Sequence, residues 1–94
     1  MALVYDAGAA QYYSPAVDGK GFTEATIYIN SSANGTLDVD VSTDGQSFTD
    51  HGTMAITAGA TGVYRFTLDD TNKFFRYSVT GSATDNVTSS VALG

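Results

Sequence analysis

The sequence predicts an all-β protein, a single antiparallel β-sandwich or jelly roll of about seven or eight short strands spanning residues 1–94. Three observations lead to this fold class. Apolar side chains recur at every second position, which places them on one face of a strand. The connections are rich in Gly, Asp, Asn and Ser, which turns require. No stretch repeats apolar residues at helical spacing over the length of a helix.

Four segments carry the alternation most clearly and are typical of half-buried antiparallel strands. In chain order, the side chains expected to face the core are Ala25, Ile27 and Ile29 in residues 22–30; Leu37, Val39 and Val41 in residues 36–42; Tyr64, Phe66 and Leu68 in residues 63–68; and Phe75, Tyr77 and Val79 in residues 74–81. Weaker segments at 2–5, 10–14, 47–57 and 87–93 complete the set.

Two hairpins are predicted from the connections. Asp44-Gly45 is a tight turn that folds residues 36–42 back on residues 47–53, with Gly supplying the positive φ. The stretch DDTNK is expected to join residues 63–68 to residues 74–80. In that second hairpin Leu68 would lie opposite Phe75, Phe66 opposite Tyr77 and Tyr64 opposite Val79, with Arg65 and Arg76 on the outer face.

Composition excludes several classes of protein. The chain has 94 residues and no Cys, so it is expected to form a small domain without disulfides or the usual Cys-containing zinc sites. Its net charge is −6 with only four basic residues, which argues against nucleic acid as a partner. The N-terminal residues lack a secretory signal pattern and no window approaches the about 20 apolar residues of a membrane span. We therefore expect a chain that is made and stays soluble inside a cell, with no membrane partner.

Asp38, Asp40, Ser42 and Asp44 stand at alternate positions, followed by Gly45, and raise the question of a calcium loop. Such a loop needs Gly at its sixth position and a bidentate Glu at its twelfth, where this chain has Thr43 and Thr49. On an extended strand, Asp38 and Asp40 would stand about 7 Å apart, too far to share one ion without help. We expect no metal and no cofactor.

Catalytic signals are weak. His51 is the only imidazole that could activate a serine, and it is expected to be solvated. Asp69 and Asp70 are adjacent carboxylates in an expected loop rather than a pair across a cleft. The protein is not expected to be an enzyme.

The most unusual feature of the sequence is the presence of aromatic residues on strand faces that are expected to point to solvent. Tyr28 faces away from its inward neighbours, Phe74 away from Phe75, and Tyr12 and Tyr13 cannot both be buried by one strand. Several aromatic residues outside a small core favour a partner surface. The predicted interface residues are Tyr12, Tyr13, Tyr28, Phe74 and Arg76.

The stretches LDVDVSTDGQSF and FFRYSVTG resemble the S-x-DG-x-x-F and R-Y-x-V-x-G patterns of discoidin-like jelly rolls and of small β-sandwich virion proteins of tailed bacteriophages. Those phage proteins often begin, as here, with MA and a short DAG segment. The resemblance covers roughly residues 3–81. Discoidin domains are usually longer and commonly carry a Cys pair, so the phage proteins fit better.

This resemblance implies a non-enzymatic virion structural protein, with a capsid decoration (cement) protein on the outer surface of the phage head as the favoured role. The implied partners are the major capsid protein or other virion proteins, the implied location is the virion surface, and a homo-oligomer, favoured as a trimer, is expected. The alternatives are a tail or head-fibre component, or a small carbohydrate-binding or adhesion module. A sugar would then stack on Tyr12, Tyr13, Tyr28 or Phe74, although such platforms normally include Trp and this chain has none.

Overall fold

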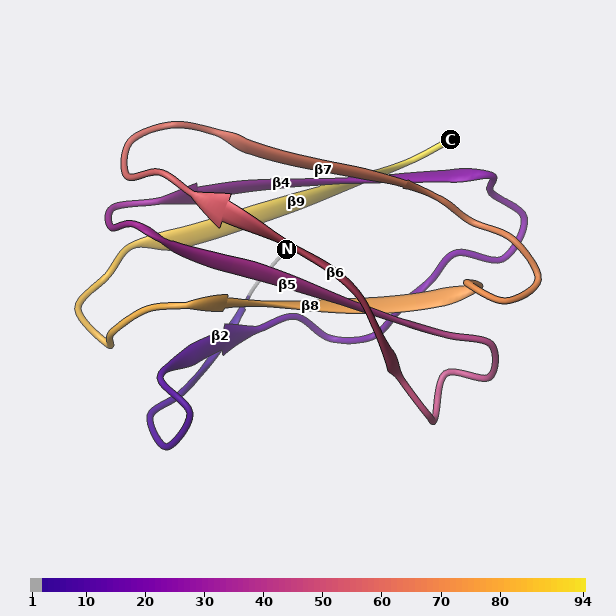
Figure 1. The fold of residues 1–94 in the computed structure, drawn as a ribbon, viewed down its shortest axis with the longest axis horizontal. Coiled ribbons are helices and arrows are strands. Elements are labelled where there is room, and N and C mark those ends of the chain that lie inside the picture. The colour runs from indigo at the N-terminus through magenta and orange to yellow at the C-terminus, as the bar shows by residue number, and fades with distance from the viewer. Residues whose placement is uncertain (1–2) are drawn as a thin grey trace.

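The structure is a computed structural model that describes residues 3–94 as two antiparallel sheets packed face to face (Figure 1). The large sheet has the strand order β1-β2-β8-β5-β6, with β3 also paired to β8, and the small sheet has the order β7-β4-β9. No helix occurs among the described residues, so none of them forms a helix able to cross a membrane. The predicted all-β sandwich is confirmed.

The described residues form nine strands, and each of the eight predicted segments overlaps one of them. The ninth, β3, has two residues and was not expected. The strands are β1 Val4–Asp6, β2 Gln11–Tyr13, β3 Val17–Asp18, β4 Glu24–Ser31, β5 Gly35–Ser42, β6 Thr49–Ile56, β7 Gly62–Thr67, β8 Phe74–Thr80 and β9 Val87–Leu93.

The predicted hairpin around Asp44-Gly45 is confirmed, since β5 pairs with β6. Gly45 has φ +77°, and the backbone N–H groups of Gln46 and Ser47 donate to Asp44 Oδ1 at 2.8 and 3.0 Å. The strands do not pair evenly along their length. Val39 lies opposite Gly52 but Asp40 lies opposite Asp50, which leaves His51 as the extra residue of a β-bulge.

The predicted hairpin between residues 63–68 and 74–80 is wrong. β7 pairs with β4 in the small sheet and β8 pairs with β5, β2 and β3 in the large sheet, so the chain crosses from one sheet to the other between Leu68 and Phe74. Both ends of this connection are held by the segment before β4. The Leu68 N–H donates to the Thr23 carbonyl at 2.9 Å, and the Gly19 N–H donates to the Lys73 carbonyl at 2.7 Å. The DDTNK stretch therefore turns the chain between layers.

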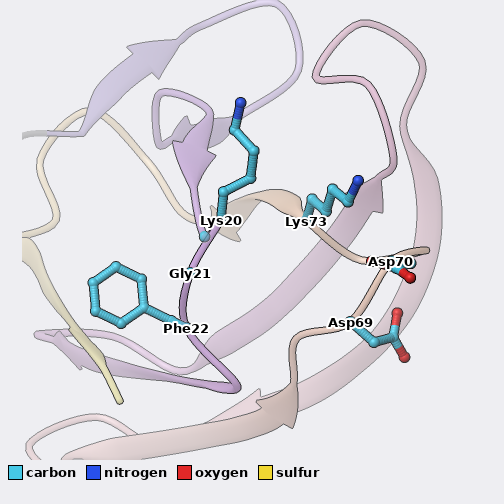
Figure 2. A pocket seen from close by; sticks show the side chains of 7 residues that line it. Lys20, Gly21, Phe22, Asp69, Asp70 and Lys73 are labelled. Carbon is cyan, nitrogen blue, oxygen red and sulfur yellow. The ribbon is translucent and has the colours of Figure 1, made fainter.

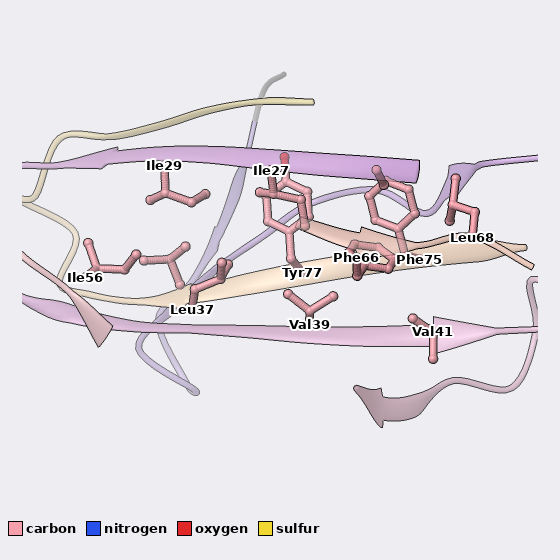
Figure 3. Close-up of a cluster of buried hydrophobic side chains, with 12 residues drawn as sticks. Ile27, Ile29, Leu37, Val39, Val41, Ile56, Phe66, Leu68, Phe75 and Tyr77 are labelled. Atoms are coloured by element: carbon pink, nitrogen blue, oxygen red, sulfur yellow. The ribbon is translucent and has the colours of Figure 1, made fainter. Parts of the chain in front are cut away.

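The inward faces were predicted correctly even where the pairing was not. The side chains expected in the core all lie between the sheets, with Tyr64 only partly buried (Figure 3). The buried apolar side chains are Ala25, Ile27, Ile29, Leu37, Val39, Val41, Ile56, Phe66, Leu68, Phe75, Tyr77 and Val79. The opposite, solvent-facing sides of the two sheets are called their outer faces below.

Candidate interface on the outer face of the large sheet

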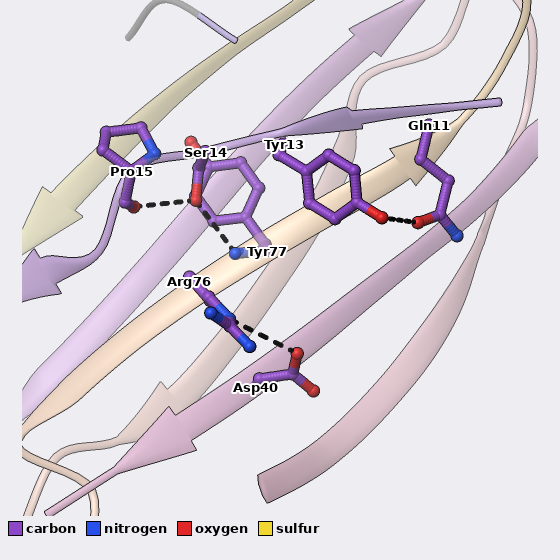
Figure 4. Close-up of polar contacts among 7 residues, drawn as sticks. All are labelled: Gln11, Tyr13, Ser14, Pro15, Asp40, Arg76 and Tyr77. Carbon is purple, nitrogen blue, oxygen red and sulfur yellow. Dashed lines mark hydrogen bonds and ion pairs between the residues drawn. The ribbon is translucent and has the colours of Figure 1, made fainter. Parts of the chain in front are cut away.

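Three of the five predicted interface residues come together on the outer face of the large sheet. Tyr13 of β2 lies opposite Ser78 of β8, and Arg76 lies opposite Asp40 of β5. Because residues paired across antiparallel strands project to the same side, and Phe74, Arg76 and Ser78 alternate with buried residues, Tyr13, Phe74 and Arg76 share this face. Figure 4 shows Tyr13 and the Arg76–Asp40 pair on neighbouring strands.

Arg76 is held in place from two sides. Its guanidinium carbon lies 4.2 Å from the centre of the Phe48 ring, and its Nε lies 3.8 Å from Asp40 Oδ2. The side chain still has 49% of its surface exposed. A guanidinium over an aromatic face is attracted by the ring and loses less rotational freedom when it binds a partner. Phe48 was not predicted as an interface residue, although it is the final Phe of the S-x-DG-x-x-F pattern.

Phe74 lies next to the β5–β6 turn. A Cβ on Gly45 would lie 3.3 Å from the Phe74 ring, so the glycine leaves the space that the ring fills. The Lys20 ammonium sits 5.5 Å from the centre of the same ring. Phe74 is half-buried by these contacts, and the remainder of its ring faces solvent on the outer face.

Tyr12 is not part of this surface. It lies opposite the buried Val79, on the inner side of β2, and its hydroxyl donates to the carbonyls of Ser82 and Asp85 at 2.7 and 3.0 Å. Partial burial, together with the nearby charge of Asp85, raises the pKa of Tyr12 above its usual value. These bonds fasten the loop between β8 and β9, and the predicted interface role of Tyr12 stays a prediction for a position apart from the outer face.

Tyr28 lies on the other side of the molecule. It projects from the outer face of the small sheet, half-buried, with Val63 opposite it on β7 and Ser90 opposite it on β9. The predicted interface residues therefore divide into an outer-face group on the large sheet (Tyr13, Phe74 and Arg76), a separate Tyr28, and a partly buried Tyr12 on the inner side of β2.

A third carboxylate, which spacing along the sequence did not predict, lies beside those of Asp38 and Asp40. Asp50 of β6 joins Asp38 and Asp40, and one carboxylate oxygen from each lies within 4.8 Å of the others. Asp38 Oδ1 is buried and accepts no hydrogen bond. Burial, a hydrogen bond with Asp50 and the charges of Asp40 and Asp50 raise the pKa of Asp38. These three side chains are the group among the described residues that could hold a cation, and calcium would need further oxygens from water to reach its usual six to eight.

Two of the residues considered for catalysis, His51 and Asp69, are engaged in structural contacts. His51 Nδ1 lies 2.7 Å from the Tyr64 hydroxyl, and its ring packs 5.0 Å from that of Phe66. Asp69 Oδ1 accepts hydrogen bonds from the Thr71 hydroxyl at 2.7 Å and from the backbone N–H groups of Thr71 and Asn72 at 2.8 and 3.0 Å, which together lower its pKa. His51 is thus exposed, as expected, but bonded to a phenol.

A hollow of about 140 Å³ opens at the end of the sandwich where the chain crosses between sheets (Figure 2). Two loops line it, with Phe22, Lys20 and Gly21 from one and Asp70 and Lys73 from the other. Phe22 has 44% of its surface exposed. The hollow combines an aromatic ring with charged groups of both signs, and sequence reasoning missed it because its residues belong to two loops that meet only in the fold.

No protein-family model and no curated protein matches the sequence. Among solved structures, the fold is similar to that of the PBSX exported protein XepA, with a TM-score of 0.66 and 18% identity. The match covers 99% of this chain but 35% of XepA, so this chain spans about a third of that protein. A CBM4 structure matches with a TM-score of 0.48 and 12% identity over 96% of this chain and 64% of that one. At that TM-score the likeness does not bear on function.

Proposed function

We propose that this protein is a non-enzymatic virion structural protein that binds a protein shell through the outer face of its large sheet. The observation that carries the proposal is the placement of Arg76 between the Phe48 ring and Asp40 on an open sheet face, beside Tyr13 and Phe74. Trp, Tyr and Arg contribute most to binding at protein interfaces, and aromatic side chains bring large contact areas.

The fold comparison supports a phage context for this proposal, because XepA is an exported protein of PBSX and the sandwich resembles part of it. Within that context, the favoured role is decoration of the outer surface of the phage head, with the major capsid protein or another virion protein as the partner. The protein would be made in the host cytoplasm and finish at the virion surface. A tail or head-fibre position uses the same surface chemistry.

The test is co-sedimentation of the purified protein with assembled heads of the phage that encodes it, comparing Arg76→Ala with Arg65→Ala. The two arginines form a matched pair. Arg65 lies on the outer face of the small sheet, with its side chain 61% exposed and its Nε 3.4 Å from Glu24 Oε1. Both substitutions are expected to change the free energy of unfolding by less than about 1 kcal/mol, because exposed ion pairs contribute little.

We expect Arg76→Ala to reduce binding to heads at least about tenfold, as loss of a central interface Arg does, and Arg65→Ala to bind as the wild type. Equal binding by both variants would exclude the outer face of the large sheet as the docking surface. Wild-type protein that stays in the supernatant, together with its absence from purified virions by antibody labelling, would overturn the virion role itself.

A second candidate function is binding of a small carbohydrate, and the hollow beside Phe22 is the observation that favours it. An exposed ring can stack on a sugar, while Asp70 and Lys73 offer an acceptor and a donor for hydroxyl groups. Glycan-array binding that is lost in Phe22→Ala but kept in Phe74→Ala would support this site. The expectation from sequence had placed a sugar platform on Phe74 or the tyrosines instead.

A further inference from the structure

Strand β9 forms the free edge of the small sheet, opposite β7. It has seven residues, Val87–Leu93, and pairs along its whole length with β4 without a register shift. The second side of a terminal strand presents unpaired backbone N–H and C=O groups that another strand can bind. β9 is thus a long and regular edge.

The other edge strands of the described part of the chain carry features that discourage pairing. β6 has a bulge at His51 and an exposed Asp50, β7 carries Arg65, and β1 has only three residues, of which one is Asp6. Charges, bulges and short length are the usual protections of a sheet edge. β9 has none of them, because its sequence VTSSVAL contains no charged residue and no proline.

We propose that β9 binds β9 of a second copy of this chain, antiparallel about a two-fold axis at Ser90. The sequence fits this register on both faces. Centring the pair on Ser90 sets Val87 opposite Leu93 and Ser89 opposite Val91 on the inner face, and Thr88 opposite Ala92 on the outer face. Val87, Val91 and Leu93 pack against the core but are only partly buried, so pairing extends the apolar layer across both molecules.

Charge favours a second copy at this edge over the other edges. Each chain carries a net charge of −6, so two copies repel each other unless their contact avoids acidic side chains. The uncharged β9 meets that requirement. The residues buried nearest to it are also satisfied internally, since Ser89 Oγ lies 2.8 Å from the Tyr77 hydroxyl.

Pairing through β9 joins the two small sheets into one sheet with the order β7-β4-β9-β9-β4-β7. On its outer face, Tyr28 of each copy would flank the central Ser90 pair, because Tyr28 lies opposite Ser90. The two Tyr28 side chains would emerge about 14 Å apart, three strand spacings. This two-fold pair is an alternative to the three-fold clustering expected from sequence. It uses the small sheet, so it stands independently of docking through the large sheet.

The test is sedimentation velocity of the free protein with Ser90→Lys and, as a matched control, Val63→Lys. Ser90 and Val63 both lie opposite Tyr28, on the two edges of the small sheet, and both are exposed. The wild type and Val63→Lys are expected to sediment as dimers. Ser90→Lys is expected to be a folded monomer, because it places two like charges directly opposite each other at the axis.

Disulfide formation tests the register, since the chain has no cysteine of its own. Ser90→Cys is expected to crosslink to itself under mild oxidation, whereas Thr88→Cys and Ala92→Cys each fail alone and crosslink when mixed. A wild-type monomer at concentrations well above micromolar would overturn the proposal. Loss of assembly in Val63→Lys as well would also overturn it, because it would indicate β7 of one copy pairing with β9 of the next.

Discussion

Phe66 of β7 and Phe75 of β8 meet edge to face across the core, with ring centroids 5.2 Å apart and ring planes at 87°, although their strands belong to different sheets. Edge-to-face pairs contribute about 0.5–1.5 kcal/mol beyond the burial of their area. The connection between β7 and β8 crosses from the small sheet to the large sheet. The ring pair therefore fastens the two layers beside that crossing.

Replacing Phe66 by alanine is expected to lower the free energy of unfolding by about 3–5 kcal/mol, because it removes a buried ring and leaves a cavity against Phe75. Tyr77→Ala should cost a similar amount, since Tyr77 is fully buried. Urea unfolding followed by tyrosine fluorescence gives the values. Val63→Ala, on an exposed position of the same strand as Phe66, should stay within about 0.5 kcal/mol of the wild type. A loss below about 1 kcal/mol for Phe66→Ala would contradict the core described here.

Gly52→Ala is expected to destabilise the protein by about 1–3 kcal/mol through steric overlap. A Cβ at this position would lie 2.5 Å from the Tyr64 hydroxyl oxygen, which would have to move away from His51. Thermal melts measure the loss. Adding Tyr64→Phe to Gly52→Ala removes the overlapping oxygen and should recover part of the stability, whereas Gly8→Ala, on an exposed loop, should be near neutral.

Asp38→Asn is expected to stabilise the protein at neutral pH. The pKa of Asp38 is raised in the folded state by burial and by the nearby Asp50 and Asp40, so the folded state holds this proton more tightly than the unfolded state. The free energy of unfolding of the wild type therefore falls as the pH rises from the ordinary aspartate pKa of about 3.9 through the raised one. The gain from Asp38→Asn should be larger at pH 7 than at about pH 3. Asp70→Asn removes one surface charge and serves as the control; an equal gain there would contradict the assignment to Asp38.

Asp44→Asn should show the opposite pH dependence. Hydrogen bonds from the backbone of Gln46 and Ser47, with Ser42, lower the pKa of Asp44 to about 2. Its contribution to stability is therefore present above the ordinary pKa and is lost as the pH falls toward about 2. The melting temperature of the variant should lie below that of the wild type at pH 7, and the difference should become smaller in acid. A difference that does not change with pH would mean that the carboxylate charge has no part in holding the turn.

Calcium is expected to leave the melting temperature unchanged. The Arg76 guanidinium already lies beside Asp40, and three carboxylates supply fewer than the six to eight oxygens that calcium prefers. Melts in millimolar calcium and in chelator should overlay. An upward shift with calcium that disappears in Asp50→Asn would show that the third carboxylate completes a site that the sequence spacing alone did not predict.

The sequence predicted which face of each strand is buried, but not all of the strand pairings. Alternation places Phe66 and Phe75 inward whether their strands lie side by side or in opposite layers, so it could not distinguish a hairpin from a crossing. The β5–β6 hairpin was predictable because the turn is formed by neighbouring residues: the Asp44 carboxylate accepts backbone hydrogen bonds, and Gly45 adopts a positive φ. Phe48 comes close to Arg76, and Asp50 to Asp40, only because β6 pairs with β5. This pairing cannot be deduced from spacing along the sequence.

The central position of β4 in the small sheet has a consequence for synthesis. During translation β4 leaves the ribosome well before β7 and β9, the two strands that flank it, and β9 is the last of all the strands described here. Until β9 emerges, Ile27 and Ile29 belong to a strand that is open on one side, a state prone to aggregation in incomplete chains. Chains that stop before Val87 should therefore be insoluble or rapidly degraded, because β9 is the strand that covers the open side of β4.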